Sequence, residues 1–132
     1  IANLGLLENN CLPMLRNVLF AGEVMPAKHL CYWTALLPEA HFSNLYGPTE
    51  ITVDCTYFDV PKNWTGDSLP IGVPCKNTSI LILDEFDEVA SEGELCVRGS
   101  SLALGYWNDF ERTRAVFCQN PLHKITHYIH HL

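Results

Sequence analysis

The sequence is poor in charged residues, and those that it has are mostly acidic. Only 17% of its 132 residues are charged, and the formal net charge is −7. A protein that binds nucleic acid through the phosphate backbone needs a basic face, so this charge balance argues against a nucleic-acid partner.

Long hydrophobic runs are also missing. The longest, such as residues 80–83, are far shorter than the ~20 apolar residues that a membrane-spanning helix requires. The N-terminus lacks the basic segment that opens a signal peptide. We therefore expect a cytoplasmic protein without a membrane span.

No C-x-x-C pair occurs among the cysteines, which argues against a structural zinc site. A secreted disulfide framework would usually sit in a smaller chain with a denser set of cysteines. Most of the cysteines lie in apolar segments, which predicts reduced, buried thiols. The six positions are Cys11, Cys31, Cys55, Cys75, Cys96 and Cys118.

The first third of the chain carries the pattern of a β-α-β unit. Residues 16–21 form a compact apolar run that is typical of a buried parallel strand. Pro26 suits the first turn of a helix, apolar residues then recur at helical spacing, and Pro38 ends the helix. Residues 41–46 read as the next strand.

Strand patterns dominate after residue 50. Strands are expected within residues 52–60, 69–73, 79–83 and 94–97, followed by a helix that Asp109 caps and that reaches about Phe117. The predicted fold class is α/β. Residues 1–50 end a parallel-sheet subdomain with a nucleotide-binding loop. Residues 51–132 form a small, mainly antiparallel β subdomain with a short C-terminal helix.

Residues 44–50 read NLYGPTE and combine several groups that a nucleotide needs. Tyr46 offers an aromatic face for a purine, Thr49 a hydroxyl for a phosphate, and Glu50 a carboxylate for a divalent metal between phosphates. The segment follows a predicted parallel strand, where open α/β sheets place their ligands. An ordinary Gly-Pro turn that leads into a strand is the alternative interpretation.

Three segments together resemble the adenylate-forming superfamily, which includes peptide-synthetase adenylation domains, acyl-CoA synthetases and luciferases. They are residues 44–50, residues 18–26 (VLFAGEVMP), and residues 93–99 (GELCVRG) with 104–108 (LGYWN). The sequences of these segments are most similar to those of amino-acid-activating members, especially D-alanine–carrier-protein ligases. The resemblance runs from about residue 16 to residue 122.

The resemblance implies a role for each residue of the nucleotide loop. Tyr46 would stack on adenine, Asn44 would read the purine edge, and Thr49 would contact phosphate. Glu50 would bind Mg²⁺, so that Thr49 and Glu50 form the catalytic pair. Gly47 would let the loop press against the substrate. Gly22 and Glu23 would lie beside the adenine.

The resemblance also implies a substrate pocket formed by Leu19, Ala21, Leu45, Val53 and Asp54. Leu45 and Val53 would narrow it, which favours a small amino acid such as D-alanine or serine. D-alanine ligases commonly have Cys where this chain has Ala21, so the D-preference depends on a position that departs from the pattern. Plain core packing is the alternative for Leu19, Ala21 and Val53.

The implied reaction joins an amino-acid carboxylate to the α-phosphate of ATP, which yields an aminoacyl adenylate and pyrophosphate. The aminoacyl group is then transferred to the phosphopantetheine thiol of a carrier protein. The cofactors would be ATP and Mg²⁺. A Gly/Ser/Thr-rich phosphate loop ending in Lys is missing from the sequence. We therefore expect an internal fragment that is inactive alone and that self-associates through exposed apolar edges.

Two other functions remain as alternatives at this point, an acyl- or aryl-CoA ligase fragment and a non-catalytic binding module. A separate histidine cluster lies at the C-terminus, at positions 123, 127, 130 and 131. Its four-residue spacings would suit a metal on a helix, but β-branched residues interrupt the pattern, which favours a frayed tail.

Overall fold

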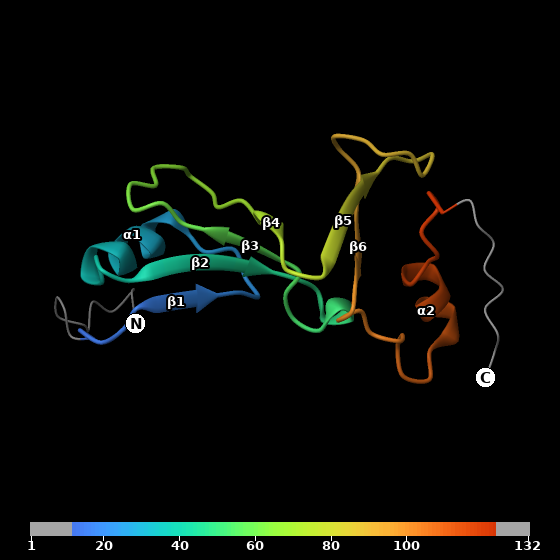
Figure 1. The fold of residues 1–132 in the computed structure, drawn as a ribbon, viewed down its shortest axis with the longest axis horizontal. Helices are drawn as coiled ribbons and strands as arrows, with labels where there is room; N and C mark the ends of the chain where they lie inside the picture. The colour runs from blue at the N-terminus through green and yellow to red at the C-terminus, as the bar shows by residue number, and fades with distance from the viewer. Residues whose placement is uncertain (1–11, 124–132) are drawn as a thin grey trace.

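The computed structural model describes residues 12–123, which form two β-sheets and two α-helices. Figure 1 shows the second sheet crossing the direction of the first. The elements in chain order are β1 (Asn17–Phe20), α1 (Ala27–Leu36), β2 (His41–Tyr46), the 3-10 turn η2 (Thr49–Ile51), β3 (Thr56–Asp59), β4 (Val73–Pro74), β5 (Thr78–Leu83), β6 (Glu94–Gly99) and α2 (Phe110–Val116).

The predicted β-α-β unit is confirmed. Strands β1 and β2 pair in parallel, with Val18 opposite Phe42, and α1 forms the connection between them. Pro26 is the N-cap of α1, and the helix ends at Leu36, just before Pro38. The fold class is also confirmed, because a sheet with parallel strands is followed by a small antiparallel one.

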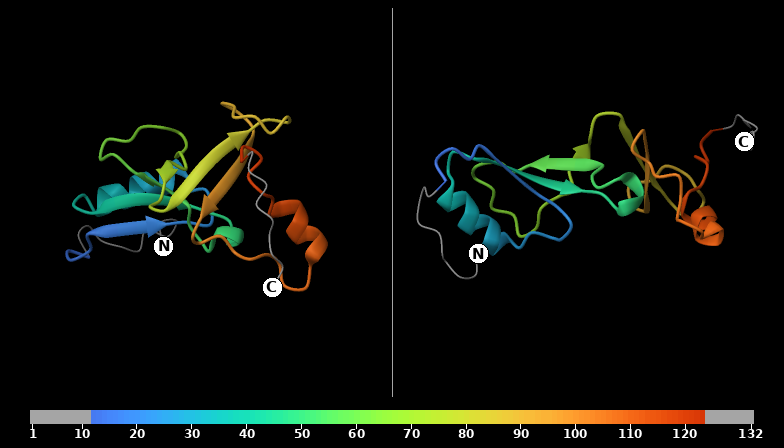
Figure 2. Two further views of the ribbon diagram at one scale, coloured as in Figure 1. Left: turned by 45° about the vertical axis from the view of Figure 1, so that its right-hand side comes forward. Right: turned by 90° about the horizontal axis from the view of Figure 1, so that it is seen from below.

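The main core lies between α1 and one face of the first sheet. Figure 2 shows α1 beside this sheet in two further views. Val60, Trp64 and Leu69, from the connection between β3 and β4, pack against the same core. Its buried centre consists of Leu30, Leu36, Leu37, Ala40 and Phe42.

The opposite face of the first sheet is open. Side chains alternate between the two faces of a strand, and directly paired residues share a face. The pairing places Leu19 beside Ser43, and Leu45 beside Tyr57, on the face away from α1. Leu19, Tyr57 and Val73 are exposed there. This face carries an apolar row that the described residues do not cover.

The first sheet continues beyond residue 50, because β3 and β4 extend it in the order β1-β2-β3-β4. The strand predicted for residues 69–73 is wrong in extent, since only the pair Val73–Pro74 joins the ladder. The conformation of Gly72 explains why β4 begins only at Val73. Its φ is +85°, and a Cβ there would lie 2.8 Å from the backbone nitrogen of Phe58. The division into two subdomains at residue 50 stays a prediction.

The second sheet and α2 form as predicted. Strands β5 and β6 pair antiparallel along their whole length, from Thr78 opposite Gly99 to Leu83 opposite Glu94. Asp109 caps α2, and its carboxylate accepts a hydrogen bond from the Arg112 backbone nitrogen at 3.0 Å. The helix ends at Val116, one residue before the predicted end.

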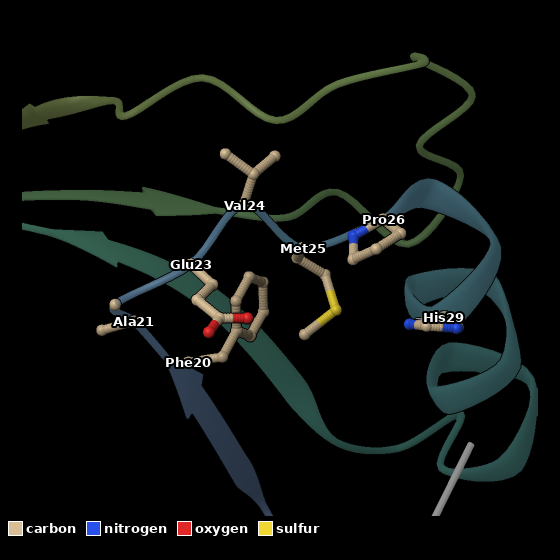
Figure 3. Close-up of a pocket in the computed structure, with 8 residues that line it drawn as sticks. Phe20, Ala21, Glu23, Val24, Met25, Pro26 and His29 are labelled. Carbon is tan, nitrogen blue, oxygen red and sulfur yellow. The ribbon is translucent and has the colours of Figure 1, made fainter. Parts of the chain in front are cut away.

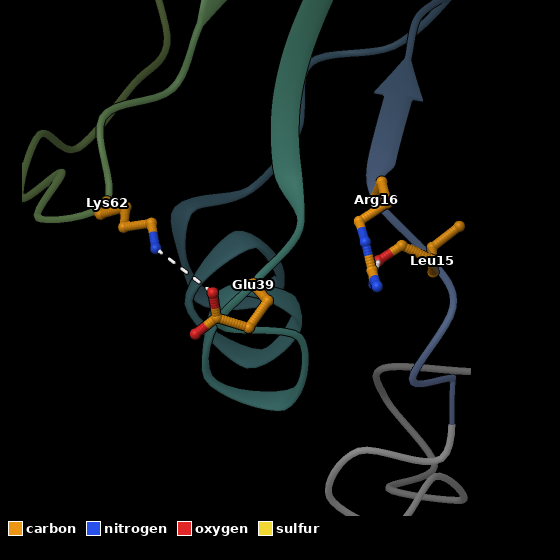
Figure 4. Close-up of polar contacts among 4 residues, drawn as sticks. All are labelled: Leu15, Arg16, Glu39 and Lys62. Carbon is orange, nitrogen blue, oxygen red and sulfur yellow. Dashed lines mark hydrogen bonds and ion pairs between the residues drawn. The ribbon is translucent and has the colours of Figure 1, made fainter.

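Surface ion pairing contributes little to this fold. Figure 4 shows Lys62 and Glu39, whose Nζ and Oε2 atoms are 3.9 Å apart. Both side chains are largely exposed, and such pairs contribute about 0–1 kcal/mol. Within residues 12–123, neither helix has the length and apolar character needed to cross a bilayer.

The cysteines of the described segment are free thiols, but they are less buried than the sequence predicts. Cys55 is fully buried, whereas Cys31 and Cys118 are exposed. Burial raises the pKa of the Cys55 thiol, and the neighbouring Cys75 raises it further. Apolar neighbours in the sequence do not ensure burial here because the sheets are covered on few of their faces.

This difference predicts the order of thiol alkylation. Iodoacetamide at neutral pH should modify Cys31 and Cys118 within the time in which Cys55 stays unmodified, because only a thiolate in contact with solvent reacts. Peptide mass spectrometry over time measures the three rates. In denaturant the rates should become equal. Modification of Cys55 as fast as Cys31 in the native protein would contradict this fold.

Candidate functional site

The NLYGPTE segment spans the end of a strand, a turn and a short 3-10 helix. Asn44, Leu45 and Tyr46 are the last residues of β2, and Thr49 and Glu50 begin η2. Strands β1 and β2 end side by side here, because they are parallel. The segment therefore lies at the carboxyl edge of the parallel pair, where α/β folds place their ligands.

Gly47 allows the backbone to fold tightly against itself. A Cβ at this position would lie 2.7 Å from the Asp54 Cα and 2.9 Å from the Cys55 nitrogen. The Cys55 nitrogen also donates to the Tyr46 carbonyl at 2.7 Å. Glycine is required at this position because the end of β2 lies against the backbone of residues 53–55. The residues between these two segments, including η2, therefore project from the sheet as a short loop.

The return from η2 to β3 is strained. Thr52 has φ +59° and Val53 has φ +90°, although both side chains are β-branched. The side chain of Val53 is 64% exposed, so apolar burial does not hold it there. Asp54 follows, and its Oδ1 is buried without a hydrogen-bond partner among the described residues. Such strain and unmet polarity are typical of binding sites.

The predicted site residues fall on both faces of the first sheet. Asn44 and Tyr46 point to the face that carries α1, and Leu19 and Leu45 lie on the open face. Asn44 already has a partner, since its Nδ2 donates to the Pro70 carbonyl at 2.8 Å. The predicted nucleotide residues and the predicted substrate-pocket residues thus lie at the same edge of the sheet, but on its opposite faces.

The loop after β1 borders a shallow depression of about 520 Å³. Gly22 has φ +89°, and a Cβ there would meet no atom within 4 Å. Figure 3 shows Val24 on the opposite side of the chain from Glu23 and Met25. The lining residues are Phe20, Ala21, Gly22, Glu23, Val24, Met25, Pro26 and His29.

Glu50 makes a contact that the sequence did not predict. The Tyr106 hydroxyl donates a hydrogen bond to Glu50 Oε1, across 56 positions of sequence. The Tyr106 side chain comes from the segment between β6 and α2, which lies beside η2 in Figure 1. The only sequence signal was that both residues belong to segments that resemble one family.

This hydrogen bond is the main cause that holds the pKa of the Glu50 carboxyl below its usual range, and it also raises the pKa of the Tyr106 hydroxyl. Glu50 is therefore ionised at neutral pH. Because its folded-state pKa is lowered, the contact stabilises the fold above the ordinary carboxyl pKa. That contribution is lost as the pH falls through the lowered value.

At this position the described residues provide a single ionised carboxylate, Glu50, and no set of several metal ligands. Residues 12–123 contain no cluster of three or more side chains that could hold a metal. A single ionised carboxylate still fits Mg²⁺, which is usually bound by one or two carboxylates together with phosphates and waters. Of the C-terminal histidines, His123 has its Nε2 3.5 Å from Arg98 Nη1, and the other three lie outside the described residues.

Comparisons with known proteins define the class. The family described as AMP-binding enzyme matches residues 2–107. The chain belongs to this family, which is the adenylate-forming superfamily that its motifs resemble.

Zwittermicin A synthase ZmaJ of Bacillus cereus is a similar curated protein, 37% identical over 122 residues. That alignment covers 87% of this chain and 23% of ZmaJ. Among solved structures, PA1221, an NRPS protein containing adenylation and PCP domains, matches 80% of this chain with TM-score 0.71 and 35% identity. AlmE, a Vibrio cholerae adenylation domain in complex with glycyl-adenosine-5'-phosphate, matches 82% with TM-score 0.70 and 31% identity.

The chain spans less than a quarter of each of these relatives, 23% of ZmaJ and 22% of both PA1221 and AlmE. The fold of this segment is therefore the fold of a part of an adenylation domain.

The strain at Val53 predicts that replacing a valine with glycine changes the free energy of unfolding in opposite directions at Val53 and at Val73. Val53→Gly should stabilise the fold by about 0.5–1 kcal/mol, because glycine removes the cost of positive φ, and this gain exceeds the backbone entropy that glycine loses on folding. Val73→Gly, at an exposed position in β4, should destabilise it by about 0.5–1 kcal/mol, because glycine is unfavourable in a strand. Urea denaturation of both variants measures the difference. A loss of stability in Val53→Gly would refute the strain.

Proposed function

We propose that this chain forms the nucleotide-binding part of an amino-acid-activating ligase. Such an enzyme joins an amino-acid carboxylate to the α-phosphate of ATP and releases pyrophosphate. It then transfers the aminoacyl group from the adenylate to a carrier-protein thiol and releases AMP. The observation that carries the proposal is the NLYGPTE segment at the carboxyl edge of β1 and β2, in a chain of the AMP-binding enzyme family. PA1221 supports the carrier-protein partner, because it contains adenylation and PCP domains.

Nucleotide binding is assigned to the face that carries α1. Tyr46, which is 38% exposed, has a ring surface available to stack on adenine. The Asn44 amide nitrogen is engaged by Pro70, so its carbonyl oxygen is the group that would accept a hydrogen bond from the adenine amine. Gly22 and Glu23 border the adjacent depression.

Phosphate and metal are assigned to η2. Thr49 is exposed at its start and offers a hydroxyl to phosphate, and the ionised Glu50 would hold Mg²⁺. The bound cation supplies charge neutralisation at the phosphates. The described residues contribute fixed positions rather than a general base, which suits a reaction that depends on alignment and electrostatics.

The substrate side chain is assigned to the open face and the strained turn, at Leu19, Ala21, Leu45, Val53 and Asp54. Leu45 and Val53 would narrow this site, which favours a small amino acid such as D-alanine or serine. Gly47 would bring the loop backbone to the substrate amine. The glycyl-adenosine-5'-phosphate held by AlmE supports a small substrate. We assign this chemistry to the cytoplasm, where ATP is available.

The test is amino-acid-dependent pyrophosphate exchange by the native polypeptide that carries these residues. D-alanine, L-alanine, serine, glycine and phenylalanine are compared, and we expect exchange with small substrates only. Glu50→Gln should lower exchange by roughly 100-fold or more, since a metal contributes several kcal/mol. Lys62→Ala is the control, because the Lys62 side chain is largely exposed and forms a surface ion pair with Glu39 at 3.9 Å.

Three outcomes would replace the proposal. Exchange that requires an acyl or aryl carboxylic acid without an amine would identify a CoA ligase. No exchange with any acid, together with ATP binding that is insensitive to Tyr46→Ala and Glu50→Ala, would identify a binding module. Exchange by residues 1–132 expressed alone would refute the expectation that this segment is inactive by itself.

A further inference from the structure

We infer that Tyr106 is a positioning residue that orients the Glu50 carboxylate toward the cation. The inference rests on the proposed function, because it assigns Glu50 to the metal. It goes beyond that function by naming a second residue, 56 positions away, on which the cation site depends.

The Tyr106 hydroxyl fixes one end of the carboxylate and leaves acceptor capacity at the other. It donates to Oε1 of Glu50. A carboxylate has two oxygens with about four lone-pair sites, so this bond and the one from the Glu50 backbone do not exhaust it. A partner that binds a metal-binding side chain in this way limits its rotamers before the metal arrives.

Tyr106 is itself held from three directions. Its backbone nitrogen donates to Thr113 Oγ1 at 2.9 Å. The guanidinium carbon of Arg112 lies 4.2 Å from the centre of the Tyr106 ring, and Phe117 packs against the ring edge with centroids 5.6 Å apart. Gly105 permits this arrangement, since its φ is +142° and a Cβ there would lie 2.9 Å from Thr113 Oγ1. The hydroxyl is thus presented by a fixed ring.

The same segment also fixes the backbone of η2. The Ala103 nitrogen donates to the Glu50 carbonyl at 2.7 Å. Thr52 Oγ1 donates to the Ser101 carbonyl, also at 2.7 Å. Residues 101–106 therefore hold Glu50 by its main chain and by its side chain together.

Apolar burial does not account for the position of this segment. Trp107 is 98% exposed, and Leu104 is fully exposed. These two large apolar side chains are exposed to solvent, whereas polar contacts connect the segment to η2. A role in fixing Glu50 explains this distribution.

The experiment measures Mn²⁺ binding by the native polypeptide with ATP, from the electron paramagnetic resonance signal of free Mn²⁺. Tyr106→Phe removes one oxygen atom and should weaken Mn²⁺ binding by about tenfold, the usual cost of losing a partner that orients a ligand. ATP binding measured in EDTA should stay unchanged, which also reports that the variant is folded. Thr113→Val, which releases the Tyr106 backbone, should cause a smaller loss.

Tyr32→Phe is the matched control. It removes the same atom from a buried hydroxyl on α1 that has no hydrogen-bond partner among the described residues, far from η2. Its Mn²⁺ affinity should equal that of the unsubstituted protein. In a Glu50→Gln background, Tyr106→Phe should have no further effect, because the tyrosine acts through the carboxylate.

Each failure has a distinct signature. The inference alone is overturned if Tyr106→Phe leaves the Mn²⁺ affinity unchanged. It is also overturned if Tyr106→Phe still lowers the Mn²⁺ affinity in the Glu50→Gln background. Absence of Mn²⁺–ATP binding in the unsubstituted protein overturns the proposed function and the inference together.

Discussion

The close backbone contact at Gly47 is the constraint on which the rest of the site depends. The end of β2 meets residues 53–55 so closely that no side chain fits between them. This contact turns the chain back into β3, so that the first sheet continues, and it leaves η2 projecting from the edge. Because η2 projects from the sheet edge, the Glu50 side chain lies next to Tyr106 rather than against the sheet. The strained φ values of Thr52 and Val53 are the geometric cost of this return.

The elements that the sequence predicted well are those governed by local patterns. Helix α1 and the strands around it follow from apolar spacing and from two prolines, and α2 follows from the cap at Asp109. Residues 69–72 were misread as a strand because the positive φ of Gly72 depends on the neighbouring strand β3. The NLYGPTE segment lies at the carboxyl edge of β2 as the sequence predicted, but its strain and the face of each side chain needed the register of the sheet.

The contact between Glu50 and Tyr106 lay beyond local patterns for a further reason. It joins a loop of the first sheet to a segment that follows the second, and no periodicity reports such a meeting. The bonds from Ala103 and Thr52 show that the two sheets are tied at this point by polar groups. The segment that follows β6 is thereby hydrogen-bonded to η2 through the main chain and through the Glu50 carboxylate. The family resemblance placed both segments in one enzyme without indicating that they touch.

The open face of the first sheet has a consequence for the thermodynamics of unfolding. Only eight apolar residues are buried among residues 12–123, and Leu19, Tyr57 and Val73 remain exposed on that face. The heat-capacity change of unfolding arises mainly from newly hydrated apolar surface. This segment hides little of that surface when folded. Its heat-capacity increment should therefore fall below the ~12–15 cal/mol/K per residue of ordinary globular proteins, and its stability should vary only weakly with temperature.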